Sequence, residues 1–130
     1  MDAGKSPALT DHVAQQFFPQ LIPGRSVLIH QEFLHKTQPW LAAQMLGLPD
    51  HFTAVAYVPR DCVVFLCTRQ VTPAVLAAAA TAHMTDDDLV AALTAAATMF
   101  APLVPGQLVL DMIPKLRANP GVRTAWKMRR

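Results

Sequence analysis

The sequence predicts a mainly α-helical domain, an irregular bundle of about six short helices delimited by prolines. Three observations favour this fold class. Eleven prolines punctuate a chain of 130 residues and leave pieces of ordinary helix length between them. Alanine, the best helix former, occupies 21 positions. The chain has the length of one domain and lacks the heptad run of a coiled coil.

Three helices are expected in the first part of the chain. Residues 10–18 space their apolar side chains as one face of a helix does. Residues 26–35 show a similar but weaker pattern, which suits a short helix. Residues 37–39 end in a proline and can open a further helix that runs through Met45, with Gly47 as a natural residue to terminate it.

The clearest expected helix covers residues 86–100. The hydroxyl of Thr85 can accept a hydrogen bond from an unpaired N–H, and the three aspartates at 86–88 meet the positive end of the helix dipole. A threonine–proline pair similarly opens a helix over 73–83. Both helices are rich in alanine, so we expect them to pack closely as an αα-hairpin. A final helix runs from Gln107 to Leu116, interrupted by Pro114.

Residues 52–70 leave an alternative open. β-Branched and aromatic residues fill 52–58 and 62–68, as in two strands, and residues 59–61 could form the turn between them. The alternative fold class is therefore α+β, with a β-hairpin at 52–68. We favour two helices, because no glycine or asparagine is present to supply the positive φ that a tight hairpin turn requires.

Charge divides the chain along its length. Residues 1–111 hold five basic and nine acidic groups, a balance of −4, whereas the last 19 residues hold six basic groups and no acid. We therefore expect a helical domain over 1–114 and a basic C-terminal tail over 115–130. Such asymmetry bears on partners and solubility rather than on fold.

The sequence lacks the signatures of common catalytic and cofactor sites. It contains no GxSxG, no GxGxxG and no Walker A loop. The two cysteines are five positions apart, as are His30 and His35, and this spacing places neither pair on one helical face for a metal. We expect no metal, no cofactor and no catalytic activity. An enzyme would be indicated if His30, Glu32 or His35 lined one deep polar pocket.

Apolar runs in the sequence are far shorter than the roughly 20 residues of a membrane-spanning helix. The N-terminal residues do not resemble a secretory signal. Two cysteines in a chain of this length do not form a disulfide framework. We therefore expect a cytoplasmic protein.

Apolar residues make up 52% of the chain and charged residues 15%, which favours an adaptor, chaperone-like protein or assembly subunit that binds another protein or a second copy of itself. The alternative is a small nucleic-acid-binding protein acting through the basic tail. The tail could also be attracted to an anionic membrane surface, or it could simply be solvated. The candidate partner-binding residues are Phe17, Phe18, Trp40, Lys115, Arg117, Arg123, Trp126, Lys127, Arg129 and Arg130. The first three are equally candidates for the core.

Overall fold

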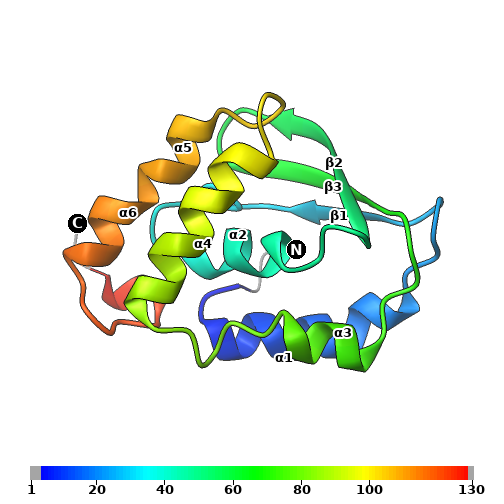
Figure 1. Ribbon diagram of the computed structural model, residues 1–130, viewed down its shortest axis with the longest axis horizontal. Helices are drawn as coiled ribbons and strands as arrows, with labels where there is room; N and C mark the ends of the chain where they lie inside the picture. The colour runs from blue at the N-terminus through cyan, green and yellow to red at the C-terminus, as the bar shows by residue number, and fades with distance from the viewer. Residues whose placement is uncertain (1–3, 129–130) are drawn as a thin grey trace.

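The computed structural model describes residues 4–128, which form an α+β fold (Figure 1). The sheet is antiparallel, with strands β1 (Val27–His30), β2 (Phe52–Val58) and β3 (Cys62–Cys67) in the order β1-β3-β2. The helices are α1 (Pro7–Phe17), α2 (Pro39–Leu46), α3 (Pro73–Ala78), α4 (Asp86–Met99), α5 (Gly106–Leu110) and α6 (Met112–Arg117). Two short 3-10 turns are η1 (Phe18–Gln20) and η2 (Ala125–Lys127).

The mainly α-helical prediction is wrong, and the α+β alternative with a hairpin at 52–68 describes the fold. β2 and β3 pair antiparallel on either side of residues 59–61. Arg60 and Asp61 have φ values of 77° and 78°, so two ordinary residues take the conformation for which glycine is preferred. The N–H of Leu34 donates to the carbonyl of Asp61 at 3.2 Å and holds the turn from outside the hairpin.

The expected helix over residues 26–35 is also replaced by a strand. β1 pairs with β3, with Leu28 opposite Phe65 and His30 opposite Val63. Its side chains alternate between exposed and buried, which is the period of a strand rather than of a helix. A four-residue apolar stretch fits both periods, and pairing with β3 decides between them.

The helix expected after Thr85 is confirmed as α4. The Thr85 hydroxyl accepts from the N–H of Asp88 at 3.1 Å, and the Asp88 carboxylate accepts from the N–H of Thr85 at 3.0 Å. This reciprocal capping box satisfies two backbone donors at the start of the helix. The hydrogen bonds from Thr85 hold the pKa of Asp88 below its ordinary value.

The remaining helices form near their expected positions, with two differences. α3 ends at Ala78, because the N–H groups of Thr81 and Ala82 donate to the Asp11 carboxylate at 2.9 and 2.8 Å instead of continuing a helix. α3 consequently lies against α1, whereas α4 packs on α2, α5 and α6, so the expected αα-hairpin is not the packing adopted (Figure 1). The helix expected at 107–116 divides at Asp111 into α5 and α6, with Pro114 in the first turn of α6.

An aromatic cluster joins the inner face of the sheet to the helices. The ring of Phe65 on β3 lies 5.2 Å from Phe33 and 5.8 Å from Phe100, between ring centres. Trp40 of α2 is fully buried, and its indole N–H donates to the carbonyl of Gly4 at 2.6 Å. The rings therefore join the β1–α2 loop and the end of α4 to the sheet, and Trp40 fixes the N-terminal segment to α2. Among residues 4–128, no helix has the length and apolarity needed to cross a lipid bilayer.

Candidate functional site

The outer side of the sheet is an apolar surface without charge. Antiparallel partners share a face, so the strand register assigns each side chain to the inner or the outer side. The outward set, here called the open sheet face, consists of Val27, Ile29, Thr53, Ala56, Val58, Cys62, Val64 and Leu66. Val27, Ile29 and Val58 on the two outer strands are 51%, 47% and 50% exposed. Contiguous apolar surface of this kind is typical of interaction sites.

The aromatic residues proposed for partner binding lie in different settings. Phe17 is 63% exposed at the end of α1. Phe18 is buried, and its ring packs edge-on against Phe52 at 5.3 Å between centres. Trp40 is buried in α2, as described above. Phe18 and Trp40 are therefore core side chains, and Phe17 is the one of the three that is available at the surface.

The basic residues proposed for partner binding are distributed over α6, the segment that follows it and η2. Lys115 and Arg117 lie in the last turn of α6, and Lys127 is exposed in η2. Trp126, beside Lys127, is 73% exposed. Arg129 and Arg130 lie outside the described residues.

Asp86 connects the C-terminal segment to the start of α4. Its carboxylate accepts from the Arg123 guanidinium at 2.6 Å and from the N–H of Gly121 at 3.0 Å. The guanidinium also donates to the carbonyl of Met84 at 3.2 Å. Burial raises the pKa of Asp86, but the hydrogen bonds from Arg123 and Gly121 and the charge of Arg123 outweigh that effect, so the pKa lies below its ordinary value. Asp86, in the first turn of α4, thus holds the chain that follows α6 against the start of that helix.

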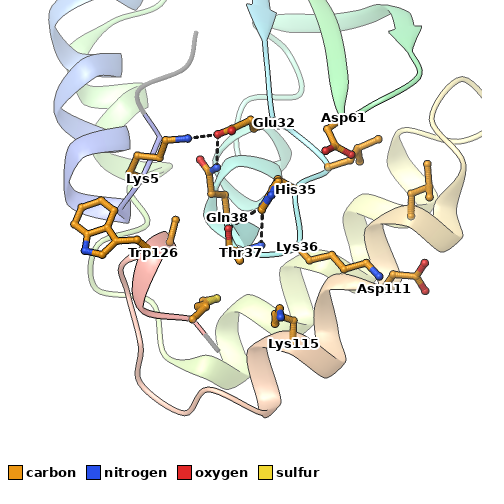
Figure 2. Close-up of a pocket in the computed structure, with 14 residues that line it drawn as sticks. Lys5, Glu32, His35, Lys36, Thr37, Gln38, Asp61, Asp111, Lys115 and Trp126 are labelled. Carbon is orange, nitrogen blue, oxygen red and sulfur yellow. Dashed lines mark hydrogen bonds and ion pairs between the residues drawn. The ribbon is translucent and has the colours of Figure 1, made fainter. Parts of the chain in front are cut away.

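A polar cleft of about 740 Å³ opens where the β1–α2 loop, the hairpin turn, α5, α6 and η2 meet (Figure 2). Its volume lies within the range of small-molecule sites, about 300–1,000 Å³. The lining residues are Lys5, Glu32, Leu34, His35, Lys36, Thr37, Gln38, Asp61, Leu108, Asp111, Lys115, Ala125, Trp126 and Met128.

Glu32 organises one wall of this cleft. It has a φ of 57°, forms an ion pair with Lys5, and accepts from the amide of Gln38 at 2.6 Å (Figure 2). The hydrogen bonds from Lys5 and then Gln38 lower the pKa of Glu32. A carboxylate held in its ionised form by two donors is a weak proton acceptor at neutral pH. Glu32 is therefore suited to positioning the loop and Lys5 rather than to general base catalysis.

His35 also lines the cleft, and its ring is oriented by Thr37. The Thr37 N–H donates to Nδ1 at 3.3 Å, and the Thr37 hydroxyl lies 2.8 Å from the same atom. An Nδ1 atom that accepts from a backbone N–H leaves the ring proton on Nε2. His30, in contrast, is buried under the sheet and does not line the cleft. Glu32 and His35 thus line the same cleft. Because the Glu32 carboxylate is bound by Lys5 and Gln38, we assign no reaction to this pair.

Sequence reasoning identified Lys115 and Trp126 among the cleft residues but missed Lys36, Asp61 and Asp111. These three come from separate segments, and no motif in the chain connects them. Within residues 4–128, no group of three or more histidine, cysteine, aspartate or glutamate side chains is arranged to hold a metal ion. No family model matches the chain, and neither a curated protein nor a solved structure matches it significantly.

Proposed function

We propose that the protein is a protein–protein interaction module, an assembly subunit that binds a second copy of itself through the open sheet face. The observation that carries this proposal is the row of half-exposed aliphatic side chains at Val27, Ile29 and Val58, on a surface that includes no charged residue. Leaving such side chains in water is unfavourable in proportion to their apolar area.

A second copy of the chain is the occupant that best matches this face. An uncharged apolar surface offers no group that would select a charged partner, but it is complementary to itself about a two-fold axis. Two sheets packed face to face lie about 10 Å apart with their side chains interleaved. The proposed dimer is therefore a four-layer arrangement, with the two sheets in the middle and the helices outside.

The size of the face indicates a weak association. Full burial of one exposed valine or isoleucine is favourable by about 1.5–3 kcal/mol, so completing the burial of a half-exposed side chain contributes roughly 1 kcal/mol. Three such residues on each of two copies supply about 6 kcal/mol, and an association cost of at least about 4 kcal/mol leaves a net gain of about 2 kcal/mol at most. We expect a weak dimer, with a dissociation constant of tens of millimolar.

Sedimentation equilibrium of the full chain over a wide concentration range tests the proposal. We expect the average mass to rise from that of a monomer toward that of a dimer. Val27→Lys and Val58→Lys place a charge on the open sheet face and should abolish the rise. Leu9→Lys is the control, because Leu9 is an exposed aliphatic residue of α1 and not part of the open sheet face. This variant should dimerise as the unmodified chain does. An average mass that stays at the monomer value up to the solubility limit, or an equal loss of association in Leu9→Lys, would contradict the proposal.

A second candidate function is binding of single-stranded nucleic acid through η2. It is favoured by Trp126, which is 73% exposed, and by the adjacent exposed Lys127. An exposed indole stacks on unpaired bases, and cations contact the phosphates. Fluorescence anisotropy with a labelled oligo(dT) should then show affinity that falls steeply between low and physiological salt, and that Trp126→Leu weakens more than Trp126→Phe. Salt-independent binding, or no effect of Trp126→Leu, would exclude this function.

We also propose that the protein is located in the cytoplasm. Cys62 and Cys67 are free thiols, and burial raises the pKa of the Cys67 thiol, which disfavours its reactive thiolate. Free thiols that lack a structural disulfide are typical of reducing compartments.

A further inference from the structure

The polar cleft presents opposite charges in equal number. Its charged lining residues are Lys5, Lys36, Lys115, Glu32, Asp61 and Asp111. Lys5 and Glu32 pair with each other. The Lys36 ammonium and the Asp61 carboxylate make no hydrogen bond or ion pair with any other side chain among residues 4–128. Lys36 extends toward Asp111 in Figure 2, but no hydrogen bond or ion pair joins the two side chains. The cleft therefore holds a cation, Lys36, and an anion, Asp61, that no ion pair of the described chain neutralises.

Backbone strain also concentrates at this cleft. The non-glycine residues with positive φ among residues 4–128 are Glu32, Arg60 and Asp61. Glu32 and Asp61 line the cleft, and Arg60 is the neighbour of Asp61. Such conformations persist where surrounding contacts enforce them, and they occur preferentially at binding sites. The hydrogen bond from the N–H of Leu34 to the carbonyl of Asp61 is one such contact, and it holds the backbone of Asp61 at the cleft.

The remaining walls are apolar. Leu34, Leu108 and Met128 contribute to the lining, and the largely exposed indole of Trp126 lies at its edge (Figure 2). An indole face packs against aliphatic groups and also attracts an ammonium group. The cleft thus combines an apolar platform with one lysine and one carboxylate, Lys36 and Asp61, that make no ion pair among residues 4–128.

We propose that this cleft binds a small zwitterion of the amino-acid or short-peptide type, with the ligand carboxylate at Lys36 and the ligand ammonium at Asp61. Equal numbers of lysines and carboxylates disfavour a phosphate or nucleotide, which would meet the acids as well as the lysines. A simple cation or anion would leave one charge of the cleft unmatched, whereas a zwitterion satisfies both. The inference is independent of dimerisation, since the open sheet face contributes no residue to the cleft.

Titration of the full-length ¹⁵N-labelled chain with the dipeptide leucyl-leucine tests the inference. We expect saturable amide shifts confined to the cleft, in residues 34–38, Asp61 and Trp126. N-Acetyl-leucyl-leucine lacks the ammonium and leucyl-leucinamide lacks the carboxylate, so each should bind about tenfold more weakly, the loss expected for one charge-assisted hydrogen bond. Equal binding of all three, stronger shifts with inorganic phosphate, or no saturable shift up to the solubility limit would overturn the proposal.

Two variants test which cleft residue binds the carboxylate of the ligand and which binds its ammonium group. Lys36→Gln should abolish the preference for leucyl-leucine over its amide while keeping the preference over the acetylated form. Asp61→Asn should do the reverse, and asparagine tolerates the positive φ of this position. Lys127→Gln and Asp50→Asn remove one charge of each sign from exposed positions outside the cleft and should change neither preference. A cleft variant that weakens all three ligands by the same factor would contradict the assignment.

Discussion

At the scale of single residues, His30 departs furthest from its ordinary chemistry. It is fully buried, with its ring centre 5.6 Å from that of Phe33 and 6.0 Å from that of Phe65. Neither ring nitrogen has a hydrogen-bond partner within residues 4–128. Burial lowers the pKa of His30 to about 3, so the ring is neutral at physiological pH. A buried donor and acceptor without partners destabilise the folded state.

We predict that His30→Leu raises the free energy of unfolding at pH 7 by about 1–3 kcal/mol, the cost of an unsatisfied buried polar group. It should also change the pH dependence. The unfolded state, with a histidine pKa of 6.5, binds a proton that the folded state rejects down to about pH 3. Stability of the unmodified chain should therefore fall by about 1.4 kcal/mol per pH unit below pH 6.5. Urea unfolding at pH 7, 6 and 5 measures both effects.

His30→Gln serves as the control, because it keeps a polar group in the same place but does not titrate. It should flatten the pH dependence between 7 and 5 without the gain at pH 7. The carboxylates with lowered pKa, such as Glu32 and Asp86, contribute to acid sensitivity only at lower pH, where their unfolded counterparts take up protons. Unchanged stability of the unmodified chain from pH 7 to pH 5 would contradict a neutral buried His30.

At the scale of elements, the β2–β3 hairpin forms where the absence of glycine and asparagine in the turn had favoured two helices. Its turn has no glycine, and Arg60 and Asp61 carry the positive φ instead. An ordinary residue pays roughly 1–2 kcal/mol for this conformation. The opposing stabilisation comes from strand pairing on both sides of β3 and from the hydrogen bond of Leu34 to Asp61, neither of which is visible in the local sequence. In α4, by contrast, the capping box lies within four consecutive residues, and the helix was predicted correctly.

Arg60→Gly should raise the free energy of unfolding by about 0.5–1 kcal/mol, because glycine removes the steric conflict while losing more backbone entropy on folding. Arg60 is exposed and does not line the cleft, so little else changes. Arg60→Ala removes the same side chain but keeps a Cβ atom, and it should lie within about 0.5 kcal/mol of the unmodified chain. Chemical denaturation measures the three proteins, and equal stability of the glycine and alanine variants would count against strain at this turn.

At the scale of the whole molecule, the C-terminal residues are attached to the domain at several points. Asp86 binds Gly121 and Arg123, and the N–H of Ala125 donates to the carbonyl of Lys5 at 2.9 Å. Ala125 and Met128 are buried. The charge asymmetry of the sequence is real, but charge alone did not indicate that these residues pack against α4 and the N-terminal segment.

Deletion of residues 119–130 should lower the free energy of unfolding by at least about 2 kcal/mol, the loss typical for removal of one buried methionine side chain. Lys127→Gln removes an exposed charge of the same segment and should change stability by less than about 0.5 kcal/mol. Thermal and urea unfolding of the three proteins provide the comparison. A separable basic tail at 115–130, as the charge pattern suggests, would instead leave the stability of the shortened chain unchanged.

The sequence by itself determined the helix starts, since proline and threonine positions such as Pro39, Pro73 and Thr85 act on backbone groups within a few residues. Trp126 and Lys115 were also recognisable as candidate binding residues. Only the tertiary structure decided that 27–30 and 52–67 form a sheet, because an apolar run fits either period until a partner strand is present. The open sheet face follows from that pairing. The cleft joins Lys36, Asp61 and Asp111 from separate segments, and folding alone brings their charges together.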